Sequence, residues 1–108
     1  MNTTTTTNEL KERRSEGMRR MAKKYGVQIT KLFLGVMEAV DNYWIAGDIT
    51  DDPVDAKFFE TEAKKRVDDM FNMLKEEGLN DLYNQFLDSE EYDMVEVPLE
   101  MVTPWEYA

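Results

Sequence analysis

The sequence of 108 residues contains no cysteine and no histidine. Without cysteine the chain has no disulfide, no thiolate nucleophile and no thiolate ligand for a metal. Without histidine it lacks the commonest general base, the Ser-His-Asp and Cys-His triads, and most zinc sites. These absences predict a protein that is not an enzyme, with no catalytic, cofactor-binding or metal-binding residue.

Long apolar runs are also missing. The most apolar stretch, residues 29–40, is short and contains Lys31 and Glu38, so it does not predict a membrane span. The N-terminus is polar and rich in threonine, without the apolar core of a signal peptide. We therefore expect no membrane partner and a cytoplasmic location, or a virion if the protein is viral. The viral (phage-like) hypothesis rests on small size and on no motif.

Charge is distributed unevenly along the chain, which carries a formal net charge of -10. Residues 1–37 hold eight basic and three acidic residues, whereas residues 38–108 hold five basic and twenty acidic residues. A chain with one basic and one acidic part can attract an opposite charge at either part, including the other part of a second copy. Head-to-tail self-association is one interpretation of this pattern.

Hydrophobic periodicity predicts helices. The apolar residues from Met18 to Tyr43 fall within an arc of about 120° at 100° per residue, and their phase does not change at Gly26. We therefore favour one helix over residues 9–46, kinked near Gly26, with two helices separated at Gly26 as the alternative. Gly47 is expected to end this helix.

A second helix is predicted to begin at Pro53, because Asp52 is a carboxylate cap before a proline whose missing N–H costs nothing there. It should run to about Glu77 and end at the following glycine. A short third helix is expected over residues 79–88. The predicted fold class is all-α: an antiparallel helical hairpin of two long helices plus a short third helix, in a domain of residues 9–88.

Extended arms are expected on both sides of this domain. Residues 1–8 should form the N-terminal arm, because their β-branched threonines favour helices poorly. Residues 89–108 contain no lysine or arginine, two prolines and no helical period, which predicts an acidic C-terminal arm with a short strand at 92–97. The apolar residues of this arm indicate that it docks on a partner.

A basic face is the first candidate for binding. At helical spacing, most basic side chains of the first helix lie opposite its apolar stripe: Arg19, Arg20, Lys23, Lys24 and Lys31. Such a face can contact phosphates with salt-dependent affinity, but no aromatic residues for base stacking alternate with it. We favour a solvated or protein-facing surface, with nucleic-acid binding as the alternative.

Exposed aromatic and apolar side chains are the second candidate. Phe58 lies nearly opposite the apolar stripe of the second helix, and Trp44 lies at the edge of the first stripe. Aromatic and methionine side chains are enriched at the anchors of protein interfaces. The residues predicted to bind a partner are Phe58, Leu99, Met101, Trp105 and Tyr107.

The acidic loop around residues 48–55 could suggest calcium, because oxygen ligands suit that ion. An EF-hand loop that begins at Asp48 would need glycine at position 53 and glutamate at position 59, where the chain has proline and phenylalanine. Solvation of the loop and capping of the next helix explain these carboxylates better.

Together these features predict a non-catalytic helical protein that binds proteins, including copies of itself, as assembly components do. Two helices bury only one face each, so oligomerisation would complete the core. Two alternatives remain open. One is an acidic mimic of nucleic acid that inhibits a host defence enzyme or an enzyme that processes DNA or RNA. The other is a nucleic-acid binder that uses the basic first helix.

Overall fold

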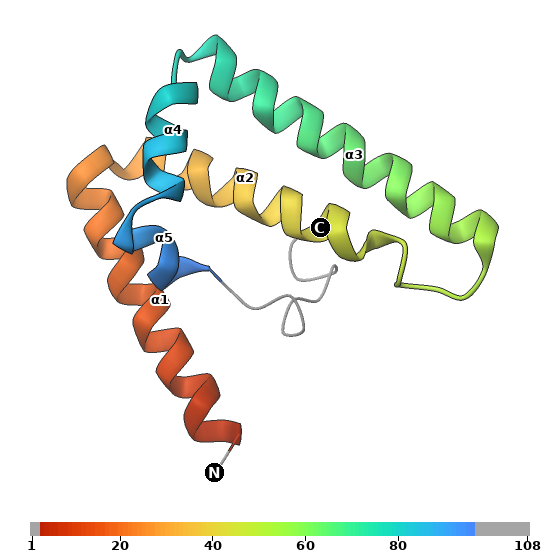
Figure 1. Ribbon diagram of the computed structural model, residues 1–108, viewed down its shortest axis with the longest axis horizontal. Helices are drawn as coiled ribbons and strands as arrows, with labels where there is room; N and C mark the ends of the chain where they lie inside the picture. The colour runs from red at the N-terminus through yellow and green to blue at the C-terminus, as the bar shows by residue number, and fades with distance from the viewer. Residues whose placement is uncertain (1–2, 97–108) are drawn as a thin grey trace.

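The computed structural model describes residues 3–96, with side chains from residue 9 onward, and within this range it is built of helices (Figure 1). In chain order these are α1 (Thr3–Tyr25), α2 (Val27–Ala46), α3 (Pro53–Glu76), α4 (Asn80–Leu87) and α5 (Glu90–Val95). No strand occurs among residues 3–96. The all-α prediction is confirmed.

A sharp bend at Gly26 separates α1 from α2. Gly26 has φ 90° and ψ 159°, a backbone conformation that is essentially restricted to glycine. Its N–H donates to the Ala22 carbonyl and its carbonyl accepts from the Thr30 N–H, both at 3.0 Å, so hydrogen bonding continues up to the bend from both sides. The preferred single helix over residues 9–46 is therefore wrong, and the alternative of two helices is correct. The spacing of the apolar residues could not distinguish one helix from two, because the apolar sides of α1 and α2 both face the same core.

Helix α1 begins nearer the N-terminus than expected. It starts at Thr3, so residues 3–8 are helical and do not form the predicted extended arm. Threonine costs at most about 0.7 kcal/mol per residue relative to alanine in a helix. Once a helix has nucleated, each further residue adds a hydrogen bond. Propagation from the residues that follow therefore accounts for the helical threonines.

The start of α3 is fixed by a side-chain cap. Asp52 Oδ1 accepts hydrogen bonds from the backbone N–H groups of Val54 (2.8 Å) and Asp55 (3.4 Å). These bonds satisfy donors that have no partner within the first turn of a helix. The predicted helix start at Pro53 is confirmed.

The end of α3 turns the chain back toward α1. Gly78 has φ 68°, which favours glycine, and the Leu79 N–H donates to the Leu74 carbonyl at 2.9 Å. With the bond from the Gly78 N–H to the Lys75 carbonyl, this forms a Schellman motif. The predicted end of the second helix and the predicted third helix agree with α3 and α4 to within one residue.

Helix α5 contradicts the extended arm and the strand that the sequence predicted for this segment. Ser89 Oγ accepts from the Tyr92 N–H at 3.3 Å and caps the helix. Glu90 and Glu91 occupy its first turn, where negative charge is favourable beside the positive end of the helix dipole. Six residues are too few for helical periodicity to be visible in the sequence.

The core lies where α1, α4 and α5 meet the adjoining ends of α2 and α3 (Figure 1). The largest fully buried side chains are Met21, Phe33, Val36, Leu74, Phe86 and Val95. The centre of the Phe33 ring lies 5.4 Å from that of Tyr25, 5.2 Å from that of Tyr83 and 5.4 Å from that of Phe86. This aromatic cluster joins helices that are distant in the sequence.

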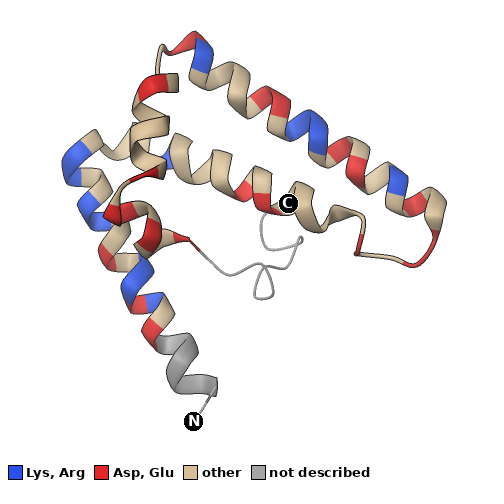
Figure 2. Cartoon of the chain, viewed as in Figure 1, with Lys and Arg blue, Asp and Glu red and all other residues tan. Residues whose placement is uncertain are grey.

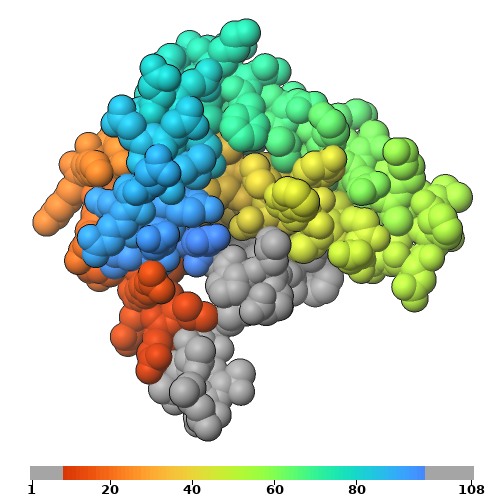
Figure 3. All heavy atoms as spheres, in the orientation of Figure 1, coloured from red at the N-terminus to blue at the C-terminus, as the bar shows by residue number. Residues whose placement is uncertain are grey.

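Helices α2 and α3 lie side by side and are antiparallel (Figure 1). The chain leaves the core along α2 and returns to it along α3. The far end of the pair, residues 44–58, is called the tip below. Figures 1 and 3 show the tip at the opposite end of the pair from α1, α4 and α5. The molecule measures 45 × 43 × 19 Å, so it is about two helices deep in its thinnest direction.

Candidate functional site

Small side chains hold α2 against α3 near the tip. On α2, Ala39 and Ala46 are buried and lie on the same side of the helix as Gly35. A Cβ atom on Gly35 would lie 2.8 Å from the terminal methyl of Met70, so this side of α2 faces α3. Ala63 of α3 is half-buried. The distance between packed helices depends on the side chains at the contact, and small ones let the backbones approach closely.

Large apolar side chains at the tip point outward. Trp44 is 69% exposed, Val54 is 77% exposed and Phe58 is 59% exposed. Trp44 is half a turn around α2 from Gly35 and therefore lies on the side away from α3. Val54 and Phe58 are one turn apart on the side of α3 away from Ala63. The prediction that Phe58 is exposed is confirmed.

Carboxylates surround the apolar side chains of the tip. Asp48, Asp51, Asp52 and Asp55 are all exposed. Residues 47–56 contain no lysine or arginine, and Lys57 is the first basic residue after them. Within the described part of the chain, no three carboxylates are grouped so that they could hold a metal ion. The tip is therefore an apolar surface with negative charge around it.

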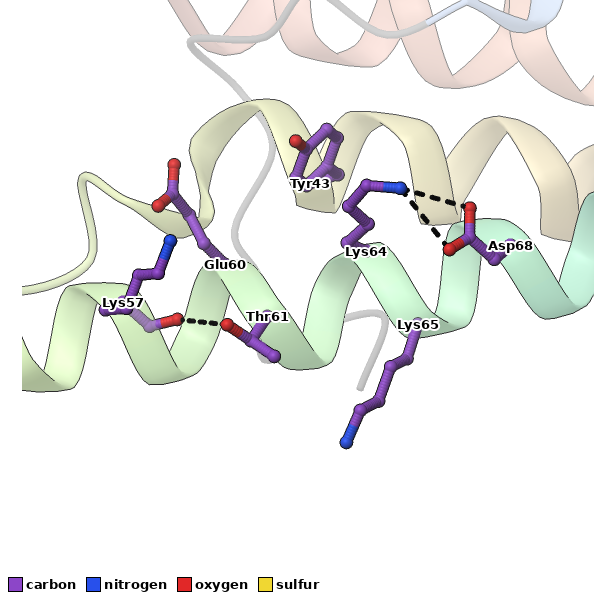
Figure 4. Close-up of a pocket in the computed structure, with 7 residues that line it drawn as sticks. All are labelled: Tyr43, Lys57, Glu60, Thr61, Lys64, Lys65 and Asp68. Carbon is purple, nitrogen blue, oxygen red and sulfur yellow. Dashed lines mark hydrogen bonds and ion pairs between the residues drawn. The ribbon is translucent and has the colours of Figure 1, made fainter.

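An open hollow of about 470 Å³ lies beside the tip, between α2 and α3 (Figure 4). Its lining residues are Tyr43, Lys57, Glu60, Thr61, Lys64, Lys65 and Asp68. Lys64 Nζ lies 3.3 Å from Asp68, and the Thr61 hydroxyl donates to the Lys57 carbonyl at 2.8 Å. Figure 4 shows Lys65 pointing away from Tyr43. These two bonds lie along α3, and neither joins a nucleophile to an adjacent base.

One side of the predicted basic face contacts the acidic helix α5. Arg20 Nη1 lies 3.4 Å from Glu90 Oε1, and Lys24 Nζ lies 3.8 Å from Glu91 Oε1. Close packing brings α1 and α5 together, because a Cβ on Gly17 would lie 2.7 Å from the Val95 side chain. The counter-charges of these two basic residues are therefore glutamates of the same chain.

The other side of the basic face points to solvent. Arg19 pairs with Glu16 of its own helix at 2.6 Å, and the hydrogen bond from Arg19 lowers the pKa of Glu16 below its ordinary value. Lys23 and Lys31 are exposed and form no ion pair with another described residue. Val27, midway between them in sequence, is 59% exposed. Figure 2 shows the concentration of basic residues in α1.

A half-buried carboxyl, Asp41, lies on α2 between the core and the tip. Burial raises the pKa of Asp41 to about 6; the negative charge of Glu96 adds to this effect, the positive charge of Arg14 opposes it, and Glu38 adds to it. Arg14 and Glu38 themselves form an ion pair at 3.6 Å. Asp41 therefore changes its charge in the range just below neutral pH.

The chain matches no protein-family model, no curated protein and no solved structure. Among the described helices, none has both the length and the apolar character needed to cross a membrane. Four of the predicted partner residues lie outside the described residues: Leu99, Met101, Trp105 and Tyr107. Phe58 is the predicted partner residue whose position the structure gives. Val54, one turn away on α3, extends its apolar surface, whereas Trp44 lies on the outer side of α2.

Proposed function

We propose that this chain is a non-catalytic assembly protein that binds further copies of itself through the tip of the α2–α3 pair. The observation that carries the proposal is the arrangement of apolar residues at the tip. Ala46 is buried there, while Trp44, Val54 and Phe58 face solvent. Side chains this large contribute about 1.5–3 kcal/mol each when they are buried. Their exposure therefore leaves a substantial driving force for association.

The residue types at the tip favour a protein partner. Aromatic side chains are enriched among the residues that dominate binding energy in protein interfaces. The centres of the Phe58 and Phe59 rings lie 5.8 Å apart in an edge-to-face arrangement. This contact limits the motion of the Phe58 side chain and reduces the conformational entropy that binding would cost.

Contacts of the basic face weaken the nucleic-acid alternative. A phosphate that bound Arg20 or Lys24 would compete with Glu90 or Glu91 for the same side chain. Their carboxylates already supply the negative charge that a phosphate would bring. This competition supports a protein-binding role over a nucleic-acid-binding role.

The test is the mass of the full chain in solution as a function of concentration, measured by sedimentation velocity. We expect the mass to rise with concentration for the wild type. The double variant V54S/F58S should remain monomeric, and M73S is the matched control because Met73 is 47% exposed at the other end of α3. A wild type that stays monomeric at millimolar concentration overturns the proposal.

A further inference from the structure

A second surface on this molecule is complementary to the tip. Four exposed residues lie on the two helices that flank the Gly26 bend, and we call them the basic corner: Arg19 and Lys23 on α1, Val27 and Lys31 on α2. The Arg19 side chain is 68% exposed, Val27 is 59% exposed, and the two lysines are exposed without an ion pair in the described part of the chain. The corner thus combines positive charge with an exposed apolar side chain.

Charge and apolar character match between the two surfaces. The tip presents Val54 and Phe58 beside exposed carboxylates, including Asp51 and Asp55. The corner presents Val27 beside lysines. Complementary potentials steer two proteins into contact and disfavour wrong pairings. Two tips would repel each other, and so would two corners, so the favoured pairing is between unlike surfaces.

A molecule cannot satisfy this complementarity by itself. The corner lies at the start of α2 and the tip at its end, and a helix of 20 residues is about 30 Å long. Figure 2 shows the basic end of α1 and the acidic loop between α2 and α3 at opposite ends of the molecule. The two surfaces therefore meet only when they belong to different copies.

Contacts between α1 and α5 supply a precedent within the chain. Basic residues of α1 form ion pairs with glutamates of α5 on one side of the helix. Arg19 and Lys23 lie on a different side of α1, which α5 leaves exposed. The second partner of α1 would thus resemble the first, as an acidic segment with apolar residues beside its carboxylates.

We propose that the acidic, apolar tip of one copy docks on the basic corner of the next copy, head to tail. This inference rests on the proposed function and specifies which surfaces meet. Because the two surfaces differ, each contact leaves one tip and one corner unfilled. Such a contact repeats until it closes a ring or extends a filament.

The experiment mixes two variants of the full chain, each altered at one surface. F58R places a positive charge on the tip, and K23E/K31E reverses the charge of the corner. Circular dichroism must first show wild-type helicity for each variant. The matched controls are M73R and K75E, which make the same kinds of change at exposed positions near the end of α3.

Native mass spectrometry and sedimentation are the measurements. Each variant alone should associate at least tenfold more weakly than the wild type, as expected from the loss of a residue that dominates an interface. An equimolar mixture should restore association through the one intact tip and the one intact corner, giving a dimer of one copy of each. The controls should assemble like the wild type, and added salt should weaken that assembly.

Other outcomes overturn the inference in distinguishable ways. If K23E/K31E assembles like the wild type while F58R does not, the tip binds something other than the corner, and the proposed function survives alone. If K23E/K31E loses only the binding of a fluorescent DNA duplex, the corner is a nucleic-acid site. If the wild type does not self-associate, both proposals fail.

Discussion

The two ends of the α2–α3 pair use similar residues in opposite ways. At the core end, Phe33 of α2 and Leu74 of α3 are fully buried. At the tip, the buried residues of α2 include Ala46, while Trp44 and Phe58 are largely exposed. At the core end these two helices thus bury some large side chains completely, although Val27, Phe71 and Met73 are exposed there. At the tip, the buried residue of α2 is a small one and the large side chains are exposed.

The difference follows from what covers each end. Three further helices, α1, α4 and α5, supply apolar side chains around the core end. Within residues 3–96 the tip has only two helices, and two helices can bury only the faces that they turn toward each other. Single exposed apolar residues are ordinary, but several large ones at one end of a molecule indicate a binding surface. The comparison thus separates residues that stabilise the fold from residues available for a partner.

The largest expected effect tests this separation with two phenylalanines. Phe33→Ala should lower the free energy of unfolding by about 3–5 kcal/mol, because it removes a ring from the centre of the aromatic cluster. Phe58→Ala should change it by less than about 0.5 kcal/mol, because the ring is exposed. Urea unfolding followed by circular dichroism measures both.

Protein concentration must be low in that measurement, since association stabilises the folded state by mass action. At high concentration Phe58→Ala should unfold at lower urea than the wild type, because it assembles less. If the two variants lose equal stability in dilute solution, the tip contributes to the core and the comparison is wrong.

A smaller effect is expected from two glycines within helices. In Gly17→Ala the new Cβ would lie 2.7 Å from a Val95 methyl and 2.8 Å from Met94 Cβ, so α5 must shift away from α1. We expect a loss of about 1–3 kcal/mol from this overpacking. In Gly35→Ala the one heavy atom within 4 Å is the Met70 methyl, at the end of a flexible side chain.

The stability of Gly35→Ala should therefore depend on helix propensity. In a helix, alanine is favoured over glycine by about 1 kcal/mol. We expect unchanged or slightly higher stability. The melting temperature of each variant gives the comparison. A Gly17→Ala variant as stable as Gly35→Ala would show that α5 does not pack tightly on α1.

Local signals in the sequence were sufficient for part of the fold. The cap formed by Asp52 before Pro53 and the glycine at position 78 located both ends of α3, because each acts through hydrogen bonds to its neighbours. The bend at Gly26 could not be derived in the same way. A glycine within a helical pattern fits either a continuous helix or a break, and the choice depends on packing of α1 against distant helices.

The candidate surfaces were predictable to a similar degree. Phe58 could be recognised as exposed because it lies opposite an apolar stripe. Val54 and Val27 were missed, since a single valine in the first turn of a helix carries no signal of its own. The charge separation between the two parts of the chain was visible. The sequence could not show which basic residues of α1 face α5 and which face solvent, because that depends on the packing of the two helices.

The smallest expected effect concerns Asp41, which lies between the two ends of the pair. Its pKa in the folded state, about 6, exceeds the ordinary value of 3.8 mainly because of burial. The folded state therefore holds the proton more tightly than the unfolded state, so stability should decrease as pH rises from about 4 to about 6. A shift of this size corresponds to about 3 kcal/mol for a fully buried group, and partial solvation reduces it to the order of 1 kcal/mol.

Asp41→Asn removes the charge and keeps the shape of the side chain. Above pH 6 this variant should be more stable than the wild type by the same order of 1 kcal/mol, and the difference should vanish near pH 4. Thermal unfolding at several pH values measures it, with Asp69→Asn on the exposed face of α3 as the control. If Asp41→Asn matches the wild type at pH 7, the carboxyl is hydrated. The buried region would then end before Asp41, which would leave a longer part of α2 available to a partner.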